Sequence, residues 1–227
     1  MVKPIYNELV EENRLFWGNT IKNGNLIYPD EHVIRFVKKN YREPEKTTLL
    51  DFGCGAGRNT IALLNEHFKV VAIDYTDEAI SITREKCRLS GYEETEIIRS
   101  SGMDVPIEAE SVDGVIANGS LFYNSQDRII DLLKEIKNVM KVGALIWADF
   151  RTVKDSLFGR GVRVSDNCFA LDTESGREGS LYWFADEDSL QYVFSESGFK
   201  IESLDYYEFT SNNRDTLNSW LHIIARK

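Results

Sequence analysis

The stretch LLDFGCGAGR, residues 49–58, joins an apolar run to the start of an amphipathic segment. Its glycines at positions 53, 55 and 57 allow a tight turn in which a ligand can lie against main-chain N–H groups. Asp51 precedes the first glycine, where a carboxylate suits a cationic partner and repels a pyrophosphate. The stretch therefore predicts a strand that ends in a ligand-binding turn and is followed by a helix.

Strand-like and helix-like segments alternate around this turn, which indicates a parallel sheet covered by helices on both faces. The predicted strands are 48–52, 69–73, 97–98, 112–117, 144–150, 201–209 and 220–225, and the predicted helices after the turn are 59–67, 77–90, 126–140 and 186–197. The last two strands are joined only by the polar link 210–218, which predicts antiparallel pairing. We expect an α/β, Rossmann-like sheet of seven strands with the last one antiparallel.

A second acidic residue stands about 20 residues beyond the glycines. Asp74 ends the second predicted strand, in the run Val71-Ala72-Ile73-Asp74. A carboxylate at this place can accept both hydroxyl groups of a ribose. The alternative role for Asp74 is that of a helix N-cap or a surface acid. Arg58 occupies the place of the third glycine in the G-x-G-x-x-G fingerprint of dinucleotide-binding turns, so the turn departs from that fingerprint.

Asp51-x-Gly53-Cys54-Gly55-x-Gly57 resembles motif I of the class I S-adenosylmethionine-dependent methyltransferases, and Asp74 resembles their ribose-binding acid. The stretches 101–106 and 111–116 resemble the family's adenine-lining region and the start of its fourth strand. The resemblance extends over about residues 47–150. It implies S-adenosyl-L-methionine as cofactor and S-adenosyl-L-homocysteine as product. The cofactor-binding residues that we expect are Asp51, Gly53, Cys54, Gly55, Gly57, Asp74, Tyr75, Gly102, Met103, Asp104 and Asn118.

Two of these assignments carry alternatives. Ser101 stands where many members have an Asp that binds the adenine amine, so Asp104 or the main chain of Met103 is expected to make that contact. Cys54 is interpreted as a small residue tolerated in the turn, because no His near it in the sequence would activate a nucleophilic thiol.

The acceptor is expected to be a small molecule. The run ANGSLFYN, residues 117–124, lacks the Asn/Asp-Pro-Pro-Tyr motif of the nucleic-acid and glutamine N-methyltransferases, and a net charge of −10 disfavours nucleic acid as a partner. The excess of Arg and Lys in 151–163 predicts a lip that attracts an anionic sugar or metabolite carrying a carboxylate or phosphate, with a solvated loop as the alternative. The candidate substrate-binding residues are Tyr6, Trp17, Tyr28, Tyr123, Arg151, Arg160 and Arg163, and core packing is the alternative for the aromatic ones.

We expect one methyltransferase domain, 1–227, built from four segments. A short helix at 6–17, a loop at 18–25 and a helix that opens at Asp30 form an N-terminal helical cap, 1–46, which we expect to act as a lid. A cofactor-binding core spans 47–150. Residues 151–183 lack periodicity and are too many for a simple loop, so we expect a substrate-binding insertion at 151–185. The C-terminal helix and antiparallel strands occupy 186–227.

Other functional classes are restricted by the composition. The three cysteines form no CxxC pair and the three histidines have no ligand-like spacing, so no metal site is expected. No run of about 20 apolar residues predicts a membrane span, and the cytoplasm is the expected location. No residue pattern identifies a catalytic base, selects O, N, C or S as the accepting atom, or assigns an oligomeric state. A nicotinamide-dependent oxidoreductase and a non-catalytic S-adenosylmethionine-binding module remain as alternatives.

Overall fold

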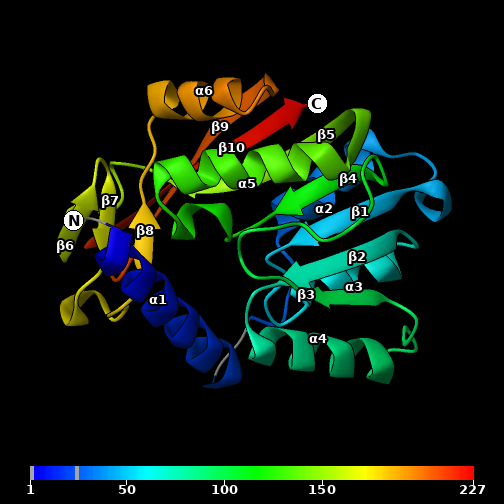
Figure 1. Cartoon of the computed structure of the whole chain (residues 1–227), viewed down its shortest axis with the longest axis horizontal. Helices are drawn as coiled ribbons and strands as arrows, with labels where there is room; N and C mark the ends of the chain where they lie inside the picture. Colours follow the sequence, from blue (N-terminus) through cyan, green and yellow to red (C-terminus); the bar gives the residue numbers. More distant parts are fainter. Residues whose placement is uncertain (1–2, 24–25) are drawn as a thin grey trace.

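The structure, a computed structural model, describes residues 3–23 and 26–227, with side chains from Glu8 onward in the first helix. Its main sheet has seven strands in the order β3-β2-β1-β4-β5-β10-β9 (Figure 1). The strands are β1 (Thr48–Phe52), β2 (Lys69–Asp74), β3 (Glu96–Arg99), β4 (Val112–Ala117), β5 (Met140–Arg151), β9 (Lys200–Ser211) and β10 (Thr216–Arg226). The helices are α1 (Lys3–Asn23), α2 (Glu31–Asn40), α3 (Arg58–Asn65), α4 (Asp77–Leu89), α5 (Gln126–Val139) and α6 (Glu187–Glu196).

The pairing confirms the predicted fold class. β1 lies parallel to both β2 and β4, and β5 lies parallel to β4. β10 pairs antiparallel with β5 on one side and with β9 on the other, as the polar link before it predicts. The last strand is therefore the one that reverses direction in an otherwise parallel sheet.

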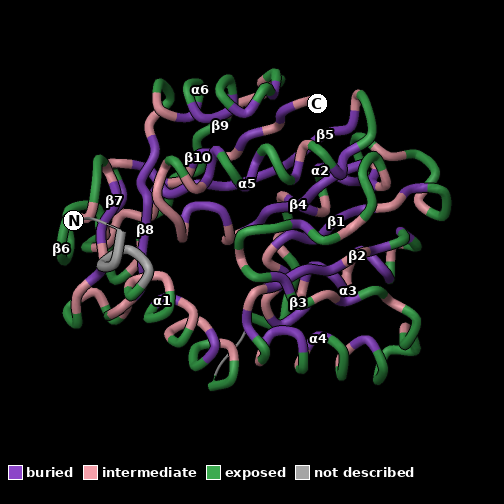
Figure 2. The backbone as a smooth tube through the Cα atoms, in the orientation of Figure 1, coloured by how far each residue is buried: buried purple, intermediate pink, exposed green. Residues whose placement is uncertain are grey.

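Helices cover both faces because the side chains of the central strands alternate between them. Leu49 belongs to a buried cluster with α2, α3 and α4, whereas Leu50 belongs to a cluster with α5 and α6. Figure 2 shows the backbone of the central strands as mostly buried and the outer sides of the helices as exposed. Among the described residues, no helix combines the length and the apolar character that crossing a bilayer requires.

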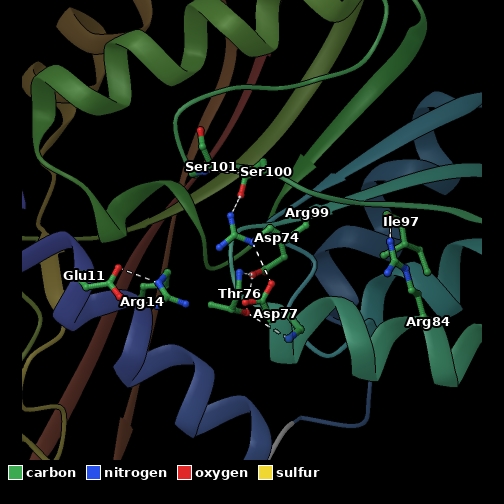
Figure 3. A network of polar contacts seen from close by, with 12 residues as sticks. Glu11, Arg14, Asp74, Thr76, Asp77, Arg84, Ile97, Arg99, Ser100 and Ser101 are labelled. Carbon is green, nitrogen blue, oxygen red and sulfur yellow. Dashed lines mark hydrogen bonds and ion pairs between the residues drawn. The ribbon is translucent and has the colours of Figure 1, made fainter.

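The first helix is longer than predicted. The expected loop at 18–25 is wrong, because α1 continues through Gly18 to Asn23. A Cβ atom at position 18 would lie 2.7 Å from a carboxylate oxygen of Glu78, so the glycine permits a close approach of α1 to α4. Near this contact, Arg14 hydrogen-bonds Glu11 and faces the acidic start of α4 (Figure 3).

The segment predicted as an irregular insertion contains a second, three-stranded antiparallel sheet. Its strands are β6 (Val162–Ser165), β7 (Cys168–Ala170) and β8 (Leu181–Trp183), with a single 3-10 turn, η3 (Thr173–Ser175), between β7 and β8. The hairpin of β9 and β10 also extends further than predicted, so that the link between its strands is only 212–215. Most residues of β9 in this extension are exposed and polar, which explains why hydrophobic periodicity does not reveal it.

We expect Gly114→Ala to destabilise the sheet at β4. A Cβ atom there would lie 2.0 Å from the Tyr41 hydroxyl oxygen and 3.0 Å from Leu49 Cδ2. Overpacking of this kind costs about 1–3 kcal/mol, so the urea midpoint of unfolding should fall at an unchanged m value. Adding Tyr41→Phe should recover part of the loss, because it removes the nearest atom. An unchanged midpoint in the single variant would contradict this packing.

Candidate functional site

A cavity of about 270 Å³ opens at the carboxyl ends of β1, β2 and β4. It is bounded by α1, by the glycine turn after β1, by the loops after β2, β3 and β4, and by the start of α5. The connections of β1 and β4 leave toward opposite faces of the sheet, and ligands of open α/β sheets bind in the crevice that such a switch point creates. The fold therefore places the predicted turn at the site.

The glycines of the turn are required by close contacts. Gly53 has a φ of +74°, and a Cβ atom there would lie 2.4 Å from the Cβ of Ser120. Gly57 has a φ of +76° and lies against Thr83, with 2.8 Å between the added Cβ and the Thr83 hydroxyl oxygen. The carbonyl oxygen of Ile73 in β2 accepts hydrogen bonds from the N–H groups of Gly53 and Cys54, at 2.8 and 3.0 Å. The turn is thus fixed to the neighbouring strand.

Asp74 connects this turn to the next one. One of its carboxylate oxygens accepts from the Gly55 N–H at 3.0 Å, and the other accepts from the N–H and hydroxyl of Thr76, both at 2.9 Å (Figure 3). Burial raises the pKa of Asp74, and these hydrogen bonds oppose the rise. The N-cap of α4 is Thr76 rather than Asp74. A carboxylate has about four lone-pair positions, so one remains for a ligand hydroxyl.

Asn118 is held at the end of β4 by a network that includes a residue absent from our predictions. Its amide nitrogen donates to Asp149 at 2.9 Å, and its oxygen accepts from Arg58 at 2.7 Å and from Asn59 at 3.0 Å. Asp149 also accepts from the Gly119 N–H at 2.6 Å. Burial raises the pKa of Asp149 to about 7. Its position inside the apolar run of β5 gives no sequence signal of this role.

The structure brings most of the predicted cofactor residues to the cavity. Gly53, Cys54, Gly55, Asp74, Tyr75, Gly102, Met103 and Asn118 line it. The other three, Asp51, Gly57 and Asp104, are not among the described residues that line the cavity. Asp51 lies behind the turn, where Thr60 donates to it at 2.6 Å and burial raises its pKa to about 6. Asp104 accepts from the N–H and hydroxyl of Ser101, at 2.9 and 2.5 Å. Met103 is thus the one of the two adenine candidates that reaches the cavity.

Of the predicted substrate residues, Trp17 and Tyr123 line the cavity, with their ring centroids 4.3 Å apart. Tyr28 is 81% exposed, and its carbonyl oxygen accepts from Arg58 at 3.4 Å. Tyr6 lies in α1, but its side chain falls outside the described part of the structure.

The predicted basic lip is not formed by the described residues. Arg151 is buried, donates to Asp155 at 2.5 Å and lies over the Trp220 ring with its guanidinium carbon 4.2 Å from the centroid. Each of the other two arginines is exposed and paired with its own acidic residue: Arg160 with Glu174 at 3.3 Å and Arg163 with Asp166 at 2.7 Å. The sequence showed an excess of positive charge because the acids that neutralise Arg160 and Arg163 come after residue 163.

Sequence reasoning also missed Asn13, which is buried and connects α1 to three parts of the site. Its amide nitrogen donates to the carbonyl oxygen of Tyr123 at 3.2 Å and to the Tyr75 hydroxyl at 3.4 Å, and its oxygen accepts from the N–H of Leu181 at 3.0 Å. A single Asn in a polar helix carries no signal of such contacts. The first helix is therefore fastened over the cavity and against β8.

The chain is similar in sequence to known methyltransferases. Residues 49–143 match a family described as "Methyltransferase domain". The chain is 32% identical over 171 residues to phosphoethanolamine N-methyltransferase 3 of Arabidopsis thaliana, covering 73% of this chain and 31% of that protein. It is 29% identical over 200 residues to a demethylmenaquinone methyltransferase of Bacillus velezensis, covering 80% and 81%. The chain spans less than two thirds of the length of several curated relatives that it matches.

A solved structure with a similar fold is the 1,6-didemethyltoxoflavin-N1-methyltransferase of Burkholderia thailandensis, with a TM-score of 0.72 at 19% identity, covering 98% of this chain and 90% of that one. That structure contains bound 1,6-didemethyltoxoflavin and S-adenosylhomocysteine. A methyltransferase structure from Methanosarcina mazei gives a TM-score of 0.70 at 21% identity, covering 84% and 96%.

We expect Arg151→Gln to reduce stability. The substitution leaves the buried Asp155 carboxylate without its cation, and breaking a buried pair costs about 3–5 kcal/mol. Arg160→Gln is the matched control, because its ion pair is exposed and should contribute at most about 1 kcal/mol. Urea unfolding of both variants measures the difference. Losses of equal size would contradict the assignment of Arg151 to the core.

We expect a pH dependence of stability from Asp149. Its pKa is about 7 in the folded chain against an ordinary value of 3.8, so folding takes up a proton between about pH 4 and pH 7. This group's contribution to the free energy of unfolding therefore falls as the pH rises through that window, and Asp51 acts in the same direction. In Asp149→Asn, the free energy of unfolding should change less between about pH 5 and pH 8 than in the native protein. The exposed control Asp131→Asn should show the native pH dependence. Equal slopes in both variants would refute the assignment.

Proposed function

Since the chain belongs to the class I S-adenosylmethionine-dependent methyltransferases, we propose that it transfers the methyl group of S-adenosylmethionine to a small, anionic metabolite. The observation that supports this most strongly is the pairing of the glycine turn with Asp74 through the Gly55 N–H, at the carboxyl ends of β1 and β2. This arrangement presents main-chain N–H groups and a carboxylate to the same cavity, as a nucleoside joined to an amino acid requires.

The residues present fit this cofactor. Gly53 keeps the turn open beside Ser120, where a Cβ atom would fill the space. We propose that the turn binds the methionine moiety, that Asp74 accepts from a ribose hydroxyl, and that Tyr75 and the 102–103 segment contact the adenine. Asp51 would act from behind the turn, by holding Thr60 at the start of α3.

Methyl transfer from S-adenosylmethionine requires few dedicated protein side chains. When bound, S-adenosylmethionine supplies a methyl group on a positively charged sulfur, which is already an activated leaving group. The chain's contribution is to orient the acceptor and to exclude water. Trp17 and Tyr123 are placed for this, because α1 lies over the cavity and is fastened there by Asn13. Asp74 is the one carboxylate among the described lining residues, and three hydrogen bonds already occupy it. We therefore propose an acceptor whose nucleophile reacts without a dedicated protein base.

A small acceptor agrees with several observations. The names of the relatives specify small molecules, phosphoethanolamine and demethylmenaquinone. A net charge of −10 opposes binding to nucleic acid phosphates. The three cysteines are free and buried, which fits the reducing cytoplasm that we propose as the location.

The proposal predicts micromolar binding of S-adenosylhomocysteine, measured by calorimetric titration. Asp74→Ala should weaken this binding about tenfold or more, because hydrogen bonds to a charged group are worth about 1.5–3 kcal/mol. Asp77→Ala removes a nearby but exposed carboxylate and should leave the affinity unchanged. NAD should not bind in the same concentration range. Equal affinity for S-adenosylhomocysteine in a folded Asp74→Ala protein, or tighter binding of NAD, would refute the proposed site.

A further inference from the structure

Three polar groups of the cavity wall are buried and unpaired. Trp17 Nε1, Ser120 Oγ and Arg128 Nη2 have almost no contact with solvent and no hydrogen-bond partner in the described part of the chain. All three residues line the same cavity. Buried polar groups in folded proteins are nearly always paired, so several unpaired groups around one cavity indicate a ligand that supplies their partners.

These groups come from three different elements. Trp17 lies on α1, with its ring against that of Tyr123. Ser120 follows β4 and lies beside the glycine turn, because a Cβ atom added at position 53 would be 2.4 Å from the Cβ of Ser120. Arg128 lies in the first turn of α5, and Leu132, four residues on, lines the cavity from the same helix face. The unpaired groups therefore line the cavity from α1, from the loop after β4 and from α5.

The chemistry of these groups selects the kind of ligand. An indole N–H and a guanidinium can only donate hydrogen bonds, and a serine hydroxyl can also donate. Their common partner is an oxygen that accepts, and a carboxylate or phosphate satisfies several donors at once while matching the charge of the guanidinium.

Of the charged residues that line the cavity, Arg128 is the one available to bind such a carboxylate or phosphate. Arg58 donates to Asn118 and to the carbonyl oxygen of Tyr28, and Asp74 is occupied by Gly55 and Thr76. Among the described residues, neither arginine forms an ion pair, but Arg58 makes these two hydrogen bonds whereas the Nη2 of Arg128 has no partner. Arg58 begins α3 directly after the glycine turn and retains N–H groups beyond these two hydrogen bonds, so we assign it to the carboxylate of the cofactor.

We propose that Arg128, Trp17 and Ser120 bind the anionic group, a carboxylate or a phosphate, of the methyl acceptor. This inference rests on the proposed function, because it assigns the second ligand of the same cavity. The sequence suggested Arg151, Arg160 and Arg163 for binding the anion. The inference assigns this role instead to Arg128, which lines the cavity.

The test uses the complex with S-adenosylhomocysteine and a pair of probes of equal shape, benzoate and benzamide. Calorimetric titration should show benzoate binding to the native complex about tenfold more tightly than benzamide, the ratio expected for a charge-assisted hydrogen bond. Arg128→Gln should abolish this preference, and Arg160→Gln, which changes an exposed arginine, should retain it. Trp17→Phe removes the N–H but keeps a ring, and should weaken the binding of benzoate severalfold and that of benzamide less, because a hydrogen bond to a charged acceptor is the stronger.

Two further titrations identify the source of the anion. S-adenosylhomocysteine and 5′-methylthioadenosine, which lacks the amino-acid moiety, should each bind Arg128→Gln as they bind the native protein. If Arg128→Gln weakens only S-adenosylhomocysteine, the anion is the carboxylate of the cofactor and the acceptor assignment is overturned. No preference for benzoate in the native complex overturns it as well. If the native protein does not bind S-adenosylhomocysteine, the proposed function itself is refuted. The titrations with benzoate and benzamide cannot give that result, so the two failures are distinguishable.

Discussion

One buried carboxylate couples the two turns on which the site depends. Asp74 ends β2, accepts from Gly55 in the turn after β1, and accepts from Thr76 at the start of α4. The two turns meet because parallel neighbouring strands end at the same edge of the sheet. Burial alone would favour the neutral acid, and the three hydrogen bonds favour the charged form. The contacts that hold the turn open are thus the same contacts that favour a carboxylate able to accept from a ligand.

The cavity has two walls of different character. On the β1–β4–β5 side, the Ser120 hydroxyl is unpaired but the other polar side chains form a closed network: Arg58 and Asn59 donate to Asn118, which donates to Asp149. That wall is fixed before any ligand arrives, as a site for a constant cofactor requires. On the side of α1 and α5, the indole of Trp17 and the guanidinium of Arg128 include buried atoms without partners. The contrast supports a division of the cavity into a preorganised cofactor side and an acceptor side that a ligand completes.

The part of the molecule predictable from sequence is the part specified by local pattern. Apolar runs locate β1, β2 and β4, glycines mark the turns after β1 and β4, and the acids at strand ends locate the site. The remaining features depend on contacts between distant segments. Gly18 lies within a helix because α1 approaches Glu78, sixty residues away, and β6 to β8 have only three or four residues each. Asp149 and Arg128 carry no motif, because their roles arise only from what the fold places beside them.

The arginines show why a count of charges along the sequence misleads about binding. An exposed guanidinium such as that of Arg163, beside Asp166, acts through water and contributes little to attraction of a ligand. Arg151 is shielded from solvent, but Asp155 already neutralises it. The Nη2 group of Arg128 is shielded from solvent and has no hydrogen-bond partner among the described residues, so an anion that reaches it meets a donor that neither water nor a counter-ion occupies. Selectivity for an anion in a chain of net charge −10 can therefore reside in one half-buried arginine with a shielded, unpaired guanidinium nitrogen rather than in the number of basic residues at the surface.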